Sequence, residues 1–264
     1  MSDFLSKIIE HKKREVQEAE KLVPERLLQL EAEKPAARRS LFDRLSNPGP
    51  FGMNVIAEIK RASPSKGPIR ANVDPKSRAA MYQRGGAAAI SVLTDREFFS
   101  GGVEDLRDAR STVELPVLRK DFVIGAYQVY ESAVIGADAV LLIVRALAPE
   151  SLKELITLCG HIGLDALVEV HNKPELEIAI SSGARIIGIN NRDLMTFVTN
   201  IQTSIDLAGH AGSGRVIVSE SGIHGRAEIE RLLDAGVFNF LIGESIMRSD
   251  DPEGFLRTLH GVSK

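Results

Sequence analysis

Acidic and basic side chains recur at the ends of short apolar runs along this chain of 264 residues. In residues 54–70, a β-branched apolar run leads into Glu58 and Lys60. Side chains alternate faces along a strand, so this carboxylate and ammonium project to the same side. A turn rich in Ser, Gly and Lys follows, with Ser63 and Pro64 at its start. We interpret the stretch as part of an enzyme site for a phosphorylated substrate; solvated charges beside an ordinary turn are the alternative.

Polar side chains also follow later apolar runs. A single polar side chain in such a place would fit a structural ion pair. If the apolar runs are the parallel strands of a barrel, as argued below, their carboxyl ends all meet at one face. Acids, two lysines and amides that meet at that face therefore indicate a catalytic site. The later positions are Arg119, Lys120 and Asp121 around the end of PVLRK, Glu169 within ALVEV, Asn190, Asn191 and Arg192 at the end of GINNR, and Glu220 and Ser221 after VIVS.

Eight apolar runs alternate with helical patterns from residue 54 onward. Continuous apolar runs are typical of parallel strands that are covered on both faces. The pattern predicts an α/β fold, with a single (β/α)8 TIM barrel as the catalytic domain over residues 49–264. An open doubly wound sheet is the alternative, but the GxGxxG turn of dinucleotide-binding sheets is absent. We expect strands at residues 55–59, 88–93, 116–120, 139–144, 166–170, 186–190, 215–219 and 238–242.

Residues 1–48 lack a strand pattern and place apolar side chains at helical spacing, with Pro24 and Pro35 as breaks. We predict an N-terminal extension of two or three helices that packs on the barrel. A membrane-binding or partner-binding helix is the alternative reading of the same amphipathic pattern.

The bulk composition excludes several classes of protein. A net charge of -3 argues against nucleic acid as the main partner. Neither a secretory leader nor an apolar run long enough to cross a membrane is present, so we expect no membrane partner and a cytoplasmic location. The only cysteine, Cys159, lies in a helical pattern and is expected to be a buried apolar residue. The six histidines show no metal-ligand spacing, so no metal site is expected.

The loops after the seventh and eighth predicted strands contain glycine at positions suited to binding phosphate. Loops at these places in barrels often bind phosphate through backbone N–H groups, and glycine lets the backbone approach an anion closely. We expect Gly222 and Gly243 to act in this way, and Glu244 to contribute its N–H with its side chain turned away. Simple strand-to-helix turns are the alternative.

Six segments in order, IAEIKRASPSKGPI, LRKDF, LVEVHN, GINNRDL, VSESGI and LIGESIMR, resemble the indole-3-glycerol-phosphate synthase family of tryptophan biosynthesis. The resemblance runs from about Lys7 to Arg248, and the Glu-x-Lys-x-x-Ser-Pro-Ser block is its most specific part. It implies a carbon–carbon lyase that converts 1-(2-carboxyphenylamino)-1-deoxyribulose 5-phosphate into indole-3-glycerol phosphate, carbon dioxide and water. It also implies that no cofactor takes part.

The resemblance assigns roles to the polar residues. It implies that Lys120 is the cationic acid of ring closure, that Glu169 acts near the departing hydroxyl, and that Lys60 and Glu58 are a second acid–base pair. How the proton transfers divide between the two lysines stays open. Residues matched to the orientation of substrate hydroxyls and lysines are Asn190, Glu220 and Ser221. The implied phosphate site is Ser63, Gly222, Gly243 and Glu244, and the implied anthranilate site is Pro64, Phe99, Phe122 and Arg192.

The chain departs from the family pattern at Gly102, where a serine is common. Two other functions compete with the synthase reading. Phosphoribosylanthranilate isomerase would share the glycine loops but is expected to use a Cys/Asp pair, and Cys159 lies far from a strand end. A non-catalytic phosphate-ligand sensor should have lost the acids and lysines. We expect one phosphorylated small molecule as substrate and a monomer, with a weak homo-oligomer as the alternative.

Overall fold

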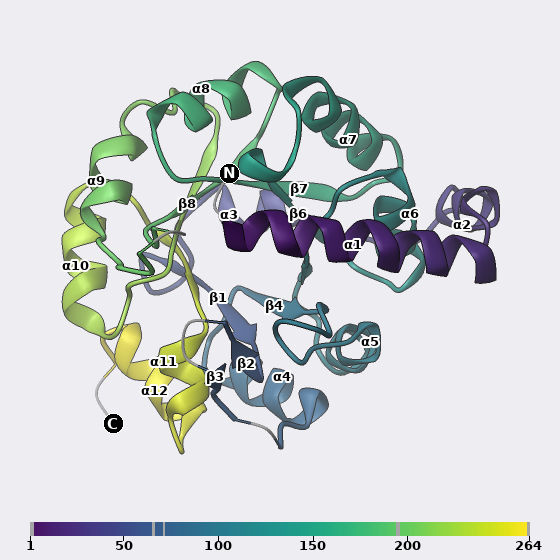
Figure 1. Cartoon of the computed structure of the whole chain (residues 1–264). Helices are drawn as coiled ribbons and strands as arrows, with labels where there is room; N and C mark the ends of the chain where they lie inside the picture. The colour runs from purple at the N-terminus through teal and green to yellow at the C-terminus, as the bar shows by residue number, and fades with distance from the viewer. Residues whose placement is uncertain (1–2, 65–66, 71, 194–195, 263–264) are drawn as a thin grey trace.

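Eight parallel strands close into a barrel in the order β1-β10-β9-β8-β7-β6-β5-β4, with helices around it (Figure 1). The computed structural model describes residues 3–64, 67–70, 72–193 and 196–262. Ser65 and Lys66 of the predicted turn lie outside these residues. The barrel strands are β1 (Asn54–Ile59), β4 (Ala89–Leu93), β5 (Val117–Lys120), β6 (Ala139–Ile143), β7 (Asp165–Val170), β8 (Ile186–Asn190), β9 (Val216–Glu220) and β10 (Asn239–Ile242). The predicted TIM barrel is confirmed, and each strand begins and ends within one residue of its expected bounds.

Helices follow every barrel strand and cover its outer face (Figure 1). The turn after β1 contains a small antiparallel ladder, β2 (Ala62–Ser63) with β3 (Gly67–Pro68), which the sequence did not indicate. The helices around the barrel are α4 (Pro75–Arg84), α5 (Val103–Thr112), α6 (Ala126–Val134), α7 (Pro149–His161), α8 (Lys173–Ser181), α9 (Gln202–Ala208), α10 (Arg226–Asp234), α11 (Glu244–Arg248) and α12 (Pro252–Leu259), with a 3-10 turn η1 (Val144–Ala146) after β6.

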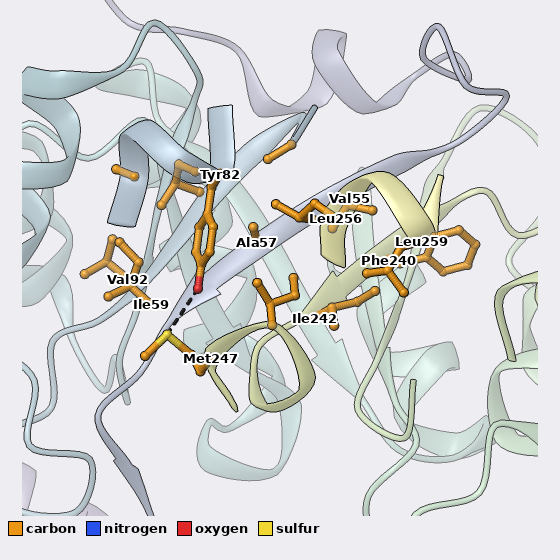
Figure 2. Close-up of a cluster of buried hydrophobic side chains, with 14 of the residues drawn as sticks. Val55, Ala57, Ile59, Tyr82, Val92, Phe240, Ile242, Met247, Leu256 and Leu259 are labelled. Atoms are coloured by element: carbon orange, nitrogen blue, oxygen red, sulfur yellow. Dashed lines mark hydrogen bonds between the residues drawn. The ribbon is translucent and has the colours of Figure 1, made fainter. Parts of the chain in front are cut away.

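Alternation along each strand divides the core into an outer and an inner part. On β1, Val55, Ala57 and Ile59 belong to an apolar cluster against the outer helices, while Ile56 belongs to the cluster inside the barrel. In the outer cluster the buried Tyr82 hydroxyl lies 3.1 Å from Met247 Sδ (Figure 2), and it donates to Glu58 O at 3.2 Å. This contact joins α4 and α11 to the carboxyl end of β1, where the predicted site begins.

The N-terminal extension contains three helices, α1 (Asp3–Leu22), α2 (Glu25–Ala32) and α3 (Leu41–Leu45). On α3, the fully buried Leu41 and Leu45 join the cluster inside the barrel, where they meet Ile56 and Leu118. The α2 helix packs beside α6. The expectation of two or three helices is met, whereas the division into units 1–48 and 49–264 stays a prediction.

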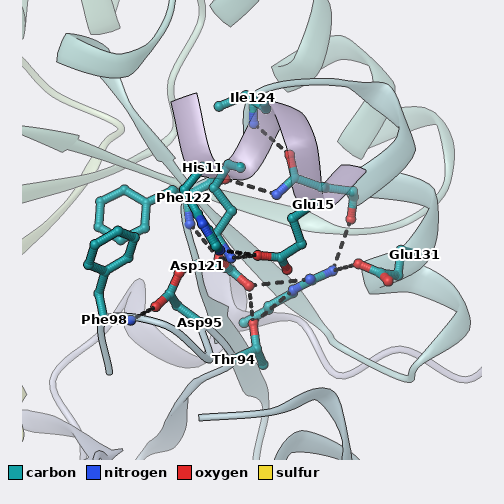
Figure 3. A network of polar contacts seen from close by, with 12 residues as sticks. His11, Glu15, Thr94, Asp95, Phe98, Asp121, Phe122, Ile124 and Glu131 are labelled. Atoms are coloured by element: carbon teal, nitrogen blue, oxygen red, sulfur yellow. Dashed lines mark hydrogen bonds and ion pairs between the residues drawn. The ribbon is translucent and has the colours of Figure 1, made fainter. Parts of the chain in front are cut away.

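A buried ion cluster holds α1 over the carboxyl ends of the barrel strands, at the end of the barrel opposite α3. Lys12 is fully buried, and its Nζ lies 2.9 Å from both Asp95 Oδ2 and Asp121 Oδ1. Figure 3 shows the network that surrounds these carboxylates, with Thr94 donating to Asp121. An unpaired buried charge costs several kcal/mol, so the two carboxylates hold α1 to the ends of β4 and β5.

Leu22, at the end of α1, is 83% exposed. Val16 and Ala19 in the second half of α1 are still partly buried against the apolar cluster that includes α2 and α6, so the packed stripe ends before Leu22. Among the helices of the described residues, none is long and apolar enough to cross a membrane.

Leu41→Ala should lower the free energy of unfolding by about 3 kcal/mol, because the change opens a cavity beneath the barrel interior. Urea unfolding of the parent and the variant measures this difference. Leu27→Ala is the matched control, since Leu27 is 57% exposed on α2 and should change stability little. Equal stability of parent and Leu41→Ala would contradict the packing of α3 into the barrel.

Candidate active site

A single cavity at the carboxyl ends of the barrel strands brings the predicted site residues together. Its volume is about 1280 Å³, open mouth included. Every residue that the sequence assigned to catalysis, phosphate or the anthranilate ring lines this cavity. These residues are Glu58, Lys60, Ser63, Pro64, Phe99, Lys120, Phe122, Glu169, Asn190, Arg192, Glu220, Ser221, Gly222, Gly243 and Glu244. Their roles stay predictions.

Lys120 lines the cavity between carboxylates that come from two other strands, neither of which is next to its own strand β5. Its Nζ is 3.3 Å from Glu220 Oε2 and 3.4 Å from Glu169 Oε2. Both carboxylates are almost fully buried, and they belong to β9 and β7. The inward positions of three strands therefore place one ammonium between two acids in a poorly solvated space.

The electrostatics of the cluster separate its two acids. Burial raises the pKa of Glu220 to about 8; Glu169 and Glu58 add to the rise, and Lys120 opposes it. Burial also acts to raise the pKa of Glu169, but Lys120, His171 and a hydrogen bond from Asn190 outweigh it and lower that pKa. At neutral pH Glu220 is therefore mostly a neutral acid, while Glu169 is a carboxylate.

The same carboxylates keep Lys120 charged. Burial alone would lower the pKa of its ammonium, but Glu220, Glu169 and Glu58 outweigh that effect and raise the pKa. Lys120 is therefore a cation in the cavity.

Glu58 and Lys60 project to the same side of β1, as their spacing predicts. Lys60 Nζ lies 2.7 Å from Glu58 Oε1. A Cβ atom on Gly243 would stand 2.3 Å from the same Oε1, so only glycine leaves room for this carboxylate. Gly243 therefore has a second reason to be glycine, besides the close approach to phosphate that we expected.

Gly188 on β8 is a site-shaping residue that sequence reasoning missed. A Cβ atom there would lie 2.1 Å from Glu220 Oε1 and 2.7 Å from a methyl group of Leu167. The space that would hold a side chain at position 188 is thus filled by the Glu220 carboxyl. A glycine within an apolar strand signals such a close approach, but it does not name the partner.

The two predicted phosphate loops lie side by side and are tied together. The Ser245 hydroxyl donates to Ile223 O at 2.7 Å. Ser221 and Gly222 both adopt left-handed backbone, with φ of 66° and 74°. Ser221 is not glycine, so its strained conformation marks a position held by its surroundings. The Ser63 hydroxyl, in the turn after the adjacent strand β1, is buried and has no hydrogen-bond partner within the described part of the chain.

The Glu244 carboxylate is paired with two arginines, and its expected role in binding phosphate through its N–H stays a prediction. It lies 3.1 Å from Arg248 Nε and 4.0 Å from Arg192 Nη2. Arg192 was assigned to the anthranilate side, so the two predicted binding regions adjoin at this pair.

Aromatic side chains form the opposite wall. The rings of Phe99 and Phe122 stand 6.1 Å apart beside the cavity. The N-terminal helix α1 completes the wall, because Phe4 packs edge-on against Phe197 at 6.3 Å and also lines the cavity. Sequence analysis named no residue of α1 as part of the site, since an amphipathic stripe does not say which surface it covers. The remaining α1 residues on the wall are Leu5 and Ile8.

Two polar residues at strand ends do not reach the cavity. Arg119 points outward from β5, where it contacts Thr94, Asp121 and Glu131 between barrel and helix. Asn191 bonds Ser219 and Ser204 behind β8. Both follow from alternation, which sends neighbours of an inward residue outward. Cys159 is buried in α7, where burial raises the pKa of its thiol to about 12, so it is not a nucleophile.

The fold and this cavity define a (β/α)8 barrel enzyme whose site lies at the carboxyl ends of its strands. Solved structures of thiamine phosphate pyrophosphorylase from Pyrococcus furiosus and of N-acetylmannosamine-6-phosphate 2-epimerase from Clostridium perfringens share the fold. Their TM-scores are 0.60 and 0.61 at 15% and 16% identity, over 84% and 85% of this chain and 96% of each solved chain. At such identities they support the fold alone.

The family model described as indole-3-glycerol phosphate synthase matches residues 5–259. Curated proteins of that name from Syntrophobacter fumaroxidans and Desulfosudis oleivorans are 54% and 50% identical, over 99% and 98% of this chain and 99% of each relative. The chain belongs to the indole-3-glycerol phosphate synthase family. The predicted membership in this carboxy-lyase family of tryptophan biosynthesis is confirmed, and the isomerase alternative was wrong.

Gly243→Ala should lower kcat about 10- to 100-fold, because the new methyl group pushes the Glu58 carboxylate off Lys60. Steady-state kinetics with the family's substrate measures the change. Gly225→Ala is the matched control, because its Cβ would meet no atom closer than 4.0 Å and its φ of -168° suits any residue. Full activity of Gly243→Ala would mean that the Glu58–Lys60 pair does not need its present geometry.

Glu220→Gln should flatten the fall of stability with rising pH. Because the folded-state pKa of Glu220 is raised from 4.5 to about 8, its proton stabilises the fold fully below about pH 4.5. This contribution is lost as the pH rises through 8, and it is worth on the order of a few kcal/mol. Urea unfolding between pH 5 and 9 compares the slopes, with the exposed Glu177→Gln as control. Parallel slopes for parent and Glu220→Gln would contradict the raised pKa.

Proposed function

We propose that this chain converts 1-(2-carboxyphenylamino)-1-deoxyribulose 5-phosphate into indole-3-glycerol phosphate, carbon dioxide and water, with Lys120 at the centre of the chemistry. The observation that carries the proposal is the placement of the Lys120 ammonium 3.3 and 3.4 Å from the carboxyl groups of Glu220 and Glu169 in the cavity. A buried cation between an ionised and a neutral acid is suited to reactions in which charge develops on an oxygen and then disappears.

The cavity offers two contrasting ends for such a substrate. We assign the phosphate to the backbone N–H groups around Gly222 and Gly243, with the buried Ser63 hydroxyl as a further donor. The aromatic ring belongs between Phe99 and Phe122 under α1, because that wall is apolar. Arg192 lies at the boundary of the two regions, where its guanidinium suits the ring carboxylate.

Ring closure joins the ring carbon that bears the carboxylate to the ketone carbon of the sugar chain. Electron density moves onto the ketone oxygen, which needs a proton or a strong hydrogen bond at that moment. Lys120 provides it, because its neighbouring carboxylates keep it cationic. The new carbon–carbon bond leaves the ring without aromaticity, and loss of carbon dioxide returns the electron pair to the ring.

Dehydration then removes the new hydroxyl as water and a proton from the adjacent carbon. Glu169 enters this step as a carboxylate, so we assign it as the base. A lysine ammonium supplies the proton to the departing hydroxyl, and the Lys60–Glu58 pair is a second candidate for that proton beside Lys120. Asn190, which hydrogen-bonds Glu169, holds the carboxylate toward the reaction.

We further propose that the enzyme acts as a monomer in the cytoplasm. Barrel residues and the N-terminal helix α1 together line the cavity in which we place the substrate. Gel filtration with light scattering should give a single-chain mass, and a dimer at micromolar concentration would contradict the first part of this proposal.

Lys120→Met should lower kcat/KM by about 1,000-fold or more, because Lys120 is the cation that pairs with both Glu169 and Glu220 and receives the developing charge. The chain has no tryptophan, so the indole fluorescence of the product appears against a low background. The rise of this signal after mixing with substrate measures the rate.

Lys60→Met is the comparison variant, since its ammonium is also paired with a cavity carboxylate. Single-turnover experiments that record carbon dioxide and indole separately divide the lysines' roles. A variant that releases no carbon dioxide lacks the acid for ring closure. A variant that releases carbon dioxide but forms no indole lacks the acid for dehydration. A parent that binds substrate without releasing carbon dioxide would favour the phosphate-ligand sensor. Full activity of Lys120→Met would refute the proposed centre.

A further inference from the structure

A chain of buried polar contacts runs outward from Glu169 through His171, and the reaction as assigned above makes no use of it. His171 follows β7 two residues after Glu169, and its side chain is only 3% exposed. Its Nε2 lies 3.4 Å from Glu169 Oε1. Its Nδ1 lies 3.0 Å from Oε2 of Glu175 on α8. The imidazole thus stands between two carboxylates, one of which lines the cavity.

Hydrogen bonds from several groups hold the Glu175 carboxylate in place. It accepts hydrogen bonds from the His171 backbone N–H at 2.8 Å, from Asn172 Nδ2 at 2.8 Å and from Arg145 Nε at 2.5 Å. Burial acts to raise the pKa of Glu175, but hydrogen bonds from His171 and Arg145 outweigh it and lower the pKa to about 2. Glu175 is therefore an ionised, acceptor-only group, and Nδ1 of His171 must carry the proton between them.

This anchor decides which nitrogen faces the site. With Nδ1–H directed at Glu175, Nε2 is the atom that meets Glu169. Two lone pairs would repel across that contact, so it is satisfied when Nε2 also carries a proton. Glu169 meets His171 through Oε1 and Lys120 through Oε2, so each oxygen has its own nitrogen partner.

The charged groups around this chain come from every element packed against it. Lys120 on β5 faces Glu169, and the carboxyl groups of Glu220 on β9 and Glu58 on β1 act on the same Lys120. Asn190 on β8 hydrogen-bonds Glu169. Arg145, from η1, faces Glu175 on the far side of the imidazole.

We propose that His171, held by Glu175, is the positioning residue for Glu169: a proton on Nε2 fixes Oε1 and leaves Oε2 directed at Lys120 and the substrate. The inference rests on the role proposed above for Glu169 and adds to it. Without the imidazole, the carboxylate could rotate about its last bond and lose its alignment with the reacting atoms, and alignment is worth much of a rate enhancement. The 3.4 Å contact is an ion-pair distance, so it orients the carboxylate without neutralising it.

His171→Leu tests the proposal, since leucine fills the space without a donor. We expect kcat to fall about 10- to 100-fold with KM within about threefold, because alignment and not binding is lost. The acidic limb of the kcat profile should move to higher pH, since His171 lowers the pKa of Glu169 in the parent. His171→Gln, which keeps a donor toward Oε1, should recover part of the rate.

Glu175→Gln is the second variant, because it retains the shape at the start of α8 while it removes the charge behind the imidazole. It should shift the same limb in the same direction, and the double variant should be no worse than His171→Leu alone. His260→Gln is the matched control: it also removes a buried histidine, but one that contacts Gly86 O between α4 and β4, and its pH profile should equal the parent's.

Nitrogen-15 NMR of the histidine-labelled chain observes the imidazole without turnover. We expect protons on both ring nitrogens of His171, one toward each carboxylate, and loss of that signature in Glu175→Gln. A parent that shows this signature but no synthase activity would refute the proposed function and leave the imidazole arrangement intact. Unchanged kcat in a folded His171→Leu, or a fall in kcat with an unmoved pH profile, would overturn the positioning role.

Discussion

The placement of one ammonium among buried carboxylates is the constraint on which the rest of this structure depends. Lys120 is approached by Glu220 and Glu169 at 3.3 and 3.4 Å, and the charge of Glu58 on β1 also interacts with it. Three ionised acids beside one lysine would leave excess negative charge in a poorly solvated cavity, which costs several kcal/mol per unpaired ion. The cluster avoids this cost because burial keeps Glu220 protonated, while Lys60 takes up the charge of Glu58.

Such a cluster persists only where the surrounding chain leaves it no room to relax. Below it, the barrel interior is apolar, and α3 closes that end with Leu41 and Leu45. Above it, α1 is held by its buried Lys12 and contributes an apolar wall to the cavity. The N-terminal extension therefore seals the barrel at one end and shapes the site at the other.

Much of this arrangement could be predicted from the sequence, and the rest depended on contacts that are distant along the chain. Strand alternation placed Glu58 and Lys60 on one side, and the barrel pattern brought the ends of β5, β7 and β9 together. The same alternation, applied residue by residue, would have sent Arg119 outward. The reason for glycine at position 188 could not be predicted locally, because Glu220, whose carboxyl fills the space, lies 32 positions later in the sequence.

The wall that α1 adds to the cavity was the other part that could not be predicted from the sequence. The stripe on α1 predicts only that one face is buried, and Lys12 appears in it as an ordinary surface charge. Its two partners come from the ends of β4 and β5, which no local pattern connects to it. The family resemblance supplied the site residues on the barrel, and the geometry supplied the reason that they need α1.

The central claim is that this one cavity holds the whole substrate with its reacting carbon over Lys120. A crystal structure of the parent with indole-3-glycerol phosphate, the proposed product, tests it most directly. We predict the phosphate against the backbone of Gly222 and Gly243, the indole between Phe99 and Phe122, and its newly closed ring facing Lys120 Nζ. A product bound elsewhere, or bound with its phosphate among the aromatic rings, would contradict the account.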